Sequence, residues 1–169
     1  MRNTFDRFNG RHQDYQAARP SYAQEFLDWL GELYAPPERY TAADIGSGTG
    51  KLSAQLLAAG FRVCGVEPNP DMRGAAEALL GGDPRFSSSN GTDHDTGLPD
   101  RSVDMVAAAQ AFHWFDGPAF ARECRRILRP GGRAVLVWNV RGSAPMNQAL
   151  AQVFREHCPS FHGFTGGMG

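Results

Sequence analysis

The sequence of 169 residues contains few cysteines and no long apolar run. Its three cysteines, Cys64, Cys124 and Cys158, lie far apart and in no metal-ligand spacing. Their odd number fits reduced thiols better than a disulfide framework. No run approaches the roughly 18 apolar residues of a membrane span, and the N-terminal MRNTFDRFNGRHQDY lacks the apolar segment of a signal peptide. We therefore expect a cytoplasmic protein with no membrane partner.

Strong charge of either sign is also missing. The formal net charge is -1 and the isoelectric point is near 6.5, which argues against a polyanion as the partner. We interpret a group of arginines near the C-terminal third as the solvated face of a surface helix. These are Arg122, Arg125, Arg126, Arg129 and Arg133. No metal is expected either, because Asp93, His94 and Asp95 form only a polar, turn-rich loop.

Strand-like and helix-like segments alternate along the chain, which has the length of one domain. This alternation predicts an α/β fold, a Rossmann-like doubly wound parallel sheet with helices on both faces. The expected strands are 40–46, 61–67, 85–92, 103–109 and 133–139. The expected helices are 21–34, 50–60, 69–82, 116–132 and 144–158. We divide this single domain into an N-terminal cap segment (1–36), a core (37–139) and a helical tail (140–169).

Three of these elements carry more specific expectations. Ser21 is the expected N-cap of the first helix. The helix over 116–132 should end in a basic turn that suits the negative end of its dipole. The segment 133–139 is apolar nearly throughout, which is typical of buried parallel strands.

The stretch TAADIGSGTGKL (41–52) places glycines at alternate positions where a strand meets a helix. Its pattern is D-x-G-x-G-x-G rather than the G-x-G-x-x-G of dinucleotide-binding folds. Glycine permits a tight turn and close approach of a ligand to the backbone, and the following helix directs free N–H groups to the same place. Glu67 ends the second strand, where doubly wound folds place an acid that binds ribose hydroxyls. Together these features predict an adenosine-containing cofactor.

The segments ADIGSGTGKLS and VCGVEPNPDM resemble the cofactor site of class I S-adenosylmethionine-dependent methyltransferases. GTDHDTGLPDRSVDMVAAAQAFHWFD and ARECRRILRPGGRAVLVWN are similar to its small-molecule branch, which carries the methyltransferase type 11 domain and includes trans-aconitate and ubiquinone-pathway enzymes. FDRFNGRHQDYQAARPSY fits the same branch. The resemblance implies methyl transfer from S-adenosylmethionine to a small molecule, with S-adenosylhomocysteine as product.

The resemblance also implies the residues that bind the cofactor. Asp44 would orient the methionine end, and Glu67 would bind the ribose. Thr92, Asp93 and His94 fall at the adenine edge, although the branch commonly has a small residue and Glu at the last two positions. The other implied contacts are Gly46, Ser47, Gly48 and Gly50 at the amino-acid portion, Pro68 and Met72 on the adenine, Gln110, Ala111 and Phe112 near the sulfonium, and Tyr15 and Arg19 as a lid.

The chemistry that this implies is an in-line displacement, in which the acceptor atom is held about 3 Å from the methyl group. His113 is the candidate catalytic base, with a structural wall or helix-start residue as the alternative. Phe112 and Trp114 are equally compatible with an aromatic wall beside the sulfonium and with core packing. Neither a basic stripe with interleaved aromatics nor the Asn-Pro-Pro-aromatic motif of base-modifying relatives is present, so nucleic acid is not the expected acceptor.

The family sheet normally ends in an antiparallel hairpin that this sequence lacks after residue 139. We therefore expect a C-terminally incomplete chain with an open edge at its fifth strand, present as a monomer or as a homodimer that covers this edge. Two alternatives to the methyltransferase stay open. One is a non-catalytic methyltransferase-like domain that binds cofactor or a protein. The other is a nicotinamide-dependent oxidoreductase, which the glycine spacing disfavours.

Overall fold

A computed structural model describes residues 21–139 of the chain. Of these, the residues up to Val137 belong to one compact unit. Tyr15, Arg19 and the expected helix over 144–158 lie outside the described residues.

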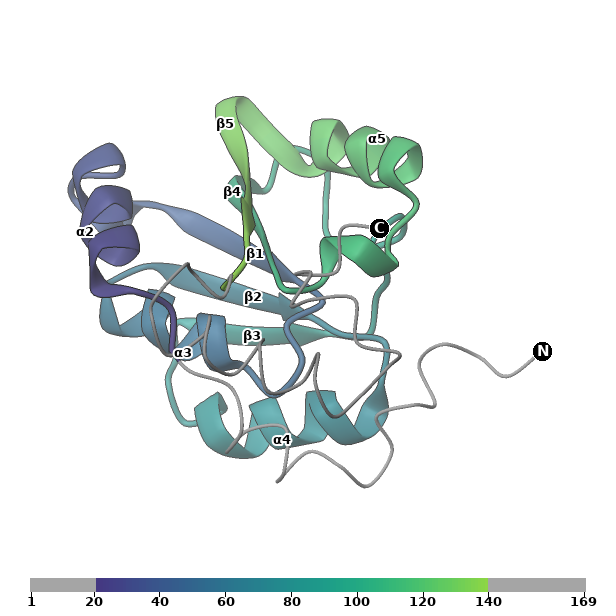
Figure 1. Ribbon diagram of the computed structural model, residues 1–169, viewed down its shortest axis with the longest axis horizontal. Helices are drawn as coiled ribbons and strands as arrows, with labels where there is room; N and C mark the ends of the chain where they lie inside the picture. The colour runs from purple at the N-terminus through teal and green to yellow at the C-terminus, as the bar shows by residue number, and fades with distance from the viewer. Residues whose placement is uncertain (1–20, 140–169) are drawn as a thin grey trace, which may run out of the picture. The chain divides into compact units, whose positions relative to one another are not determined.

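Five parallel strands form one sheet in the order β3-β2-β1-β4-β5 (Figure 1). The chain first adds β2 and β3 on one side of β1 and then crosses to add β4 and β5 on the other. This arrangement confirms the predicted α/β Rossmann-like fold. Each strand overlaps its expected segment, although β5 begins at residue 128 rather than at the expected 133. The strands are β1 (Thr41–Ile45), β2 (Arg62–Val66), β3 (Phe86–Ser89), β4 (Val103–Ala109) and β5 (Leu128–Val137).

Helices follow or precede the strands and cover both faces of the sheet. They are α2 (Gln24–Leu33), α3 (Lys51–Ala58), α4 (Pro70–Leu80) and α5 (Gly117–Ile127), with short 3-10 turns at Pro37–Arg39 and Phe112–Trp114. Figure 1 shows α5 apart from α3 and α4, with the sheet between them.

Two apolar clusters form the core, because successive residues of a strand point to opposite faces. Ala42 packs in the cluster that contains Leu30 of α2 and Leu56 of α3. Its neighbour Ala43 packs in the other cluster, with Phe120 of α5. The buried thiols Cys64 and Cys124 are both free, so Cys64 is the core residue that the sequence predicted.

The helix starts follow the predicted chemistry at α4 but not at α2. The Asn69 side chain accepts a hydrogen bond from the Met72 N–H, and Pro70 is the first helical residue, as expected. The predicted cap at Ser21 is wrong, since α2 begins at Gln24 after Ala23, with no side-chain cap.

The predicted extension of α5 to residue 132 is wrong as well, because the helix ends at Ile127. Proline disfavours the helical region for the residue before it, and Pro130 follows Arg129 directly. Leu128 is already extended, with φ -71° and ψ 136°. Arg129 therefore lies in β5, where its guanidinium donates to Asp104 of β4 at 2.7 Å.

The fifth strand is not buried, contrary to the interpretation of its apolar sequence. β5 is an edge strand of the described sheet, no residue in it is buried, and Leu136 is 38% exposed. Hydrophobicity is an incomplete guide to burial when a strand has a neighbour on one side only. The predicted open edge is present in the part of the chain that the structure describes.

The part of the core at the start of β2, opposite the glycine loop that follows β1, offers a test of stability. Phe61 is fully buried just before β2 and contacts the ring of Tyr34, with 5.8 Å between centroids. We expect Phe61→Leu to lower the free energy of unfolding by about 1–2 kcal/mol, measured by urea denaturation. Leu79→Ala is the control, because Leu79 is 53% exposed and its loss should cost about 0.5 kcal/mol or less. Equal losses would contradict the core assignment.

Candidate functional site

The carboxyl ends of β1, β2 and β4 meet where the strand order reverses, and ligands of open α/β sheets bind at such a point. Two cavities of about 160 and 30 Å³ lie there. The larger is lined by Gly46, Gly48, Glu67, Pro68, Asn69, Met72, Thr92, Asp93, Ala109, Gln110, Ala111, Trp114 and Phe115. The smaller is lined by Tyr22, Asp44, Gly46, Ser47, Gly48, Thr49, Lys51, Leu52 and Ala109.

The glycines of the loop after β1 have different physical roles. All three have positive φ: 70° at Gly46, 57° at Gly48 and 81° at Gly50. A Cβ on Gly46 would lie 2.8 Å from the Ala111 Cβ, whereas a Cβ on Gly48 would meet only Met72, at 3.6 Å. Gly48 therefore leaves the backbone accessible, while Gly46 permits close packing of the loop after β4.

Gly50 lies outside both cavity linings, although the resemblance implied a cofactor contact. A Cβ there would come within 2.8 Å of the Leu80 side chain and 3.1 Å of the Ala76 Cβ. The residue is buried at the start of α3. Close packing of α4 against this turn accounts for the third glycine.

Glu67 directly follows β2, and its buried carboxylate is held by the backbone. Oε2 accepts a hydrogen bond from the Gly48 N–H and Oε1 accepts one from the Asn69 N–H, both at 2.9 Å. Loss of hydration raises the pKa of Glu67, and these two hydrogen bonds and the charge of Arg73 oppose that rise. Since a carboxylate has about four acceptor positions, both oxygens can still accept a ligand hydroxyl.

The loop between β3 and β4 brings Thr92 and Asp93 to the larger cavity. Thr92 closes a turn with Asp95, in which the Thr92 N–H donates to the Asp95 carbonyl at 2.8 Å and the Asp95 N–H donates to Thr92 Oγ1 at 3.1 Å. Asp93 Oδ2 accepts from the Asp116 N–H at 3.0 Å. The loop is thereby attached to the start of α5.

The loop after β4 forms another wall of the larger cavity. Gln110 has a φ of 56°, which is uncommon for a residue other than glycine, and its N–H donates to the Val137 carbonyl at 2.8 Å. Trp114 and Phe115 line the cavity. Phe112 instead packs on the core, with its ring centroid 5.7 Å from that of Phe120.

The two histidines proposed for the site lie outside the linings of these cavities. His113 is exposed in the 3-10 turn, with its ring 4.8 Å from that of Trp114. His94 is exposed, and its Nδ1 lies 3.0 Å from Asp93 Oδ1. A general base at His113 and an adenine contact at His94 thus receive no support from this geometry.

Asp44 lies at the end of β1 beside the smaller cavity and is almost completely buried. Its Oδ2 accepts a hydrogen bond from Ser53 Oγ at 2.7 Å. Burial raises the pKa of Asp44 to about 6, although the hydrogen bonds from Ser53 oppose this rise. Ser47 lines the same cavity. The smaller cavity therefore presents an acid whose charge depends on pH near neutrality.

This raised pKa predicts a pH dependence of stability. The folded chain binds a proton at Asp44 more tightly than the unfolded chain does, so stability should fall as the pH rises from about 4 to about 6. The shift corresponds to about 3 kcal/mol at neutral pH. We expect Asp44→Asn, which stays neutral and can still accept from Ser53, to be more stable than wild type at pH 7.5 and equal to it below pH 4. Urea unfolding at a series of pH values tests this, and parallel curves for the two proteins would refute it.

Several lining residues were not found from the sequence. Asn69 was recognised only as a helix cap, and its position two residues after Glu67 was the available signal. Phe115 was missed because the sequence does not show which aromatic of AFHWF faces the cavity. The others are Ala109, which lines both cavities, and Tyr22, Thr49, Lys51 and Leu52, which line the smaller one.

Two negative findings apply to residues 21–139. No helix there has the length and apolar character to cross a membrane. The same residues contain no group of three or more His, Cys, Asp or Glu that could hold a metal ion.

Solved structures that superpose on this fold include methyltransferases. A protein from Anaeromyxobacter dehalogenans, assigned as a type II methyltransferase, superposes with a TM-score of 0.64 at 35% identity, over 82% of this chain and 57% of that one. A SAM-dependent methyltransferase from Aquifex aeolicus shares the fold, with a TM-score of 0.59 at 18% identity, over 78% of each chain. The α/β fold described above is thus a methyltransferase fold.

Sequence comparisons agree with the structures. Residues 43–136 match the family described as a methyltransferase domain. An uncharacterized methyltransferase from Mycobacterium tuberculosis is 42% identical over 127 residues, which are 75% of this chain and 49% of that protein. One from Schizosaccharomyces pombe is 31% identical over 145 residues, which are 85% of this chain and 57% of that protein. The chain belongs to the class I S-adenosylmethionine-dependent methyltransferases and spans about half the length of the curated relatives it matches.

Proposed function

We propose that this chain binds S-adenosylmethionine in the larger cavity and serves methyl transfer to a small-molecule acceptor. The observation that carries the proposal is the Glu67 carboxylate, which is oriented by the Gly48 and Asn69 N–H groups at the point where the strand order reverses. Its two oxygens can accept the two ribose hydroxyls.

The charge of the cavity supports this cofactor over a nicotinamide dinucleotide. Among the described residues that line the larger cavity, the charged side chains are Glu67 and Asp93, and both are acids. Acids attract the cationic sulfonium and repel a pyrophosphate. These two carboxylates, which accept hydrogen bonds and carry negative charge, fit a cofactor with ribose hydroxyls and a positive charge.

The remaining contacts follow from the cavity lining. Pro68 and Met72 offer apolar surface to the adenine, and Thr92 and Asp93 lie in the loop proposed for its edge. Gln110 and Ala111 border the sulfonium region. Asp44 and Ser47, beside the smaller cavity, are the proposed neighbours of the amino-acid portion. We keep the proposal that Tyr15 and Arg19, which lie outside the described residues, act as a lid.

When bound, the cofactor supplies a methyl group already activated by the sulfonium. The task of the chain is then to hold the acceptor in line and to exclude water. Trp114 lines the cavity and is 48% exposed, so its ring can contact both a cation and an acceptor. No base is needed when the acceptor is a carboxylate, which agrees with the position of His113 outside the cavity linings.

A panel assay tests the proposal. The purified chain, with S-adenosylmethionine labelled in its methyl group, is offered small carboxylic acids and phenols, and S-adenosylhomocysteine is quantified. Product above the level without acceptor supports the enzyme. Saturable binding without product on any acceptor would favour the alternative, a non-catalytic cofactor-binding domain. Absence of binding, with NADH as a parallel ligand, would refute the cofactor assignment.

We further propose that the protein is cytoplasmic and that it is a monomer or a homodimer. We also propose that its acceptor is a small molecule rather than nucleic acid. The net charge of -1 supports the last of these.

A further inference from the structure

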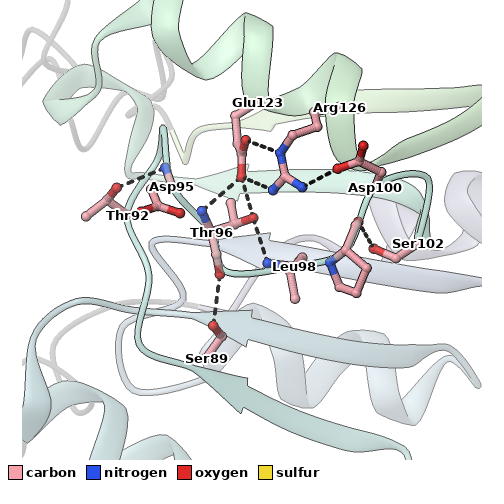
Figure 2. A network of polar contacts seen from close by, with 10 residues as sticks. Ser89, Thr92, Asp95, Thr96, Leu98, Asp100, Ser102, Glu123 and Arg126 are labelled. Atoms are coloured by element: carbon pink, nitrogen blue, oxygen red, sulfur yellow. Dashed lines mark hydrogen bonds and ion pairs between the residues drawn. The ribbon is translucent and has the colours of Figure 1, made fainter.

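A polar cluster lies between α5 and the loop that joins β3 to β4 (Figure 2). At its centre is Glu123 of α5, whose carboxylate accepts four hydrogen bonds. Oε1 accepts from the Thr96 N–H at 2.9 Å, from Thr96 Oγ1 at 2.6 Å and from Arg126 Nη2 at 2.7 Å, and Oε2 accepts from Arg126 Nε at 2.8 Å. Oε1 thus accepts three of these hydrogen bonds and Oε2 accepts one.

Thr96 connects this cluster to the sheet and to the rest of the loop. Its carbonyl accepts a hydrogen bond from Ser89 Oγ at 2.8 Å, and its Oγ1 accepts from the Leu98 N–H at 3.2 Å. Thr96 is completely buried, and Glu123 is 7% exposed. Arg126 keeps the pKa of Glu123 low, at about 2, so the carboxylate stays charged throughout the physiological range.

The cluster lies next to the part of the loop that reaches the larger cavity. Thr96 directly follows the turn closed by Thr92 and Asp95. Asp93 within this turn is attached to the start of α5 through the Asp116 N–H. α5 therefore holds the loop at two points, its N-cap residue Asp116 and the second turn, which carries Glu123.

We propose that Thr96 and Glu123 are positioning residues, which hold the turn of Thr92 and Asp93 against the cavity so that it contacts the adenine end of the cofactor. This inference rests on the proposed function. Filling the same space with apolar side chains would pack the loop without fixing its position, whereas the two directional hydrogen bonds from Thr96 to Glu123 specify one position.

The test uses Thr96→Val, which removes the Oγ1 hydroxyl at nearly constant size, and Thr96→Ser, which keeps it. Asp100→Asn alters only the exposed end of the cluster, where Asp100 Oδ1 accepts from Arg126 Nη1 at 2.7 Å. Phe61→Leu is the control for a stability loss far from the cavity. Affinity for S-adenosylhomocysteine is measured by calorimetry well below the melting temperature, and hydrogen exchange of the Asp95 and Thr96 amides is measured without ligand.

We expect Thr96→Val to weaken binding about tenfold, as the loss of one well-placed contact would, and to accelerate exchange at both amides. Thr96→Ser, Asp100→Asn and Phe61→Leu should bind within about twofold of wild type, although Phe61→Leu melts several degrees lower. Wild-type affinity or unchanged exchange in Thr96→Val would overturn the inference, as would equal weakening in Thr96→Ser. If the wild-type chain itself does not bind, the proposed function is wrong, and the exchange data alone decide whether Thr96 holds the loop.

Discussion

Replacing Glu67 with alanine is expected to weaken S-adenosylhomocysteine binding at least about 100-fold. Hydrogen bonds to a charged group contribute about 1.5–3 kcal/mol each, and two ribose hydroxyls would lose their acceptor. The variant also leaves the Gly48 and Asn69 N–H groups without the carboxylate that orients them. Isothermal calorimetry with wild type and variant at the same pH measures the change directly.

The matched control for this variant is Glu77→Ala. Glu77 lies on α4, its side chain is 52% exposed, and it pairs with Arg73 at 3.8 Å. Its removal changes the net charge equally, but exposed pairs contribute little. Affinity of Glu67→Ala within about threefold of wild type would show that Glu67 does not bind the ligand, and an equal loss in Glu77→Ala would point to a general charge effect.

The second large effect is expected at Gly46. Gly46→Ala should lower the free energy of unfolding by about 2–5 kcal/mol, because a left-handed conformation costs roughly 1–2 kcal/mol for a residue with a Cβ and overpacking adds about 1–3 kcal/mol. The new methyl group would lie 2.8 Å from the Ala111 Cβ and 3.3 Å from Phe115 Cζ. Both neighbours line the larger cavity, so their displacement should also reshape it.

Gly48→Ala separates these two costs. Gly48 has a similar φ of 57°, but its added Cβ would meet only the flexible end of Met72, at 3.6 Å. We expect a loss of about 1–2 kcal/mol from the backbone alone. Urea unfolding of the two variants measures the difference, and equal losses would mean that the loop after β4 moves away from Gly46 without cost.

Residue pattern predicted part of the lining of the larger cavity. The glycine loop after a strand and Glu67 at the end of the next strand identified the cavity edge, because the carboxyl ends of neighbouring parallel strands must meet. Thr92, Asp93, Gln110 and Ala111, which the family resemblance implied, line the same cavity, and their contact with a cofactor stays a prediction. The sequence could not show whether Phe112 or Phe115 lines the cavity, because a 3-10 turn rather than a regular period decides which ring faces it.

The sequence by itself determined the alternation of strands and helices, the cap at Asn69 and the place of the acid after β2, because these depend on local periodicity and backbone preference. Only the tertiary structure decided the strand order, the packing role of Gly50 and the exposure of β5, since each depends on which segments become neighbours. The contact between Thr96 and Glu123 belongs to this second group. It joins residues 27 positions apart in the sequence, and only their approach in the fold makes the carboxylate a partner of the loop.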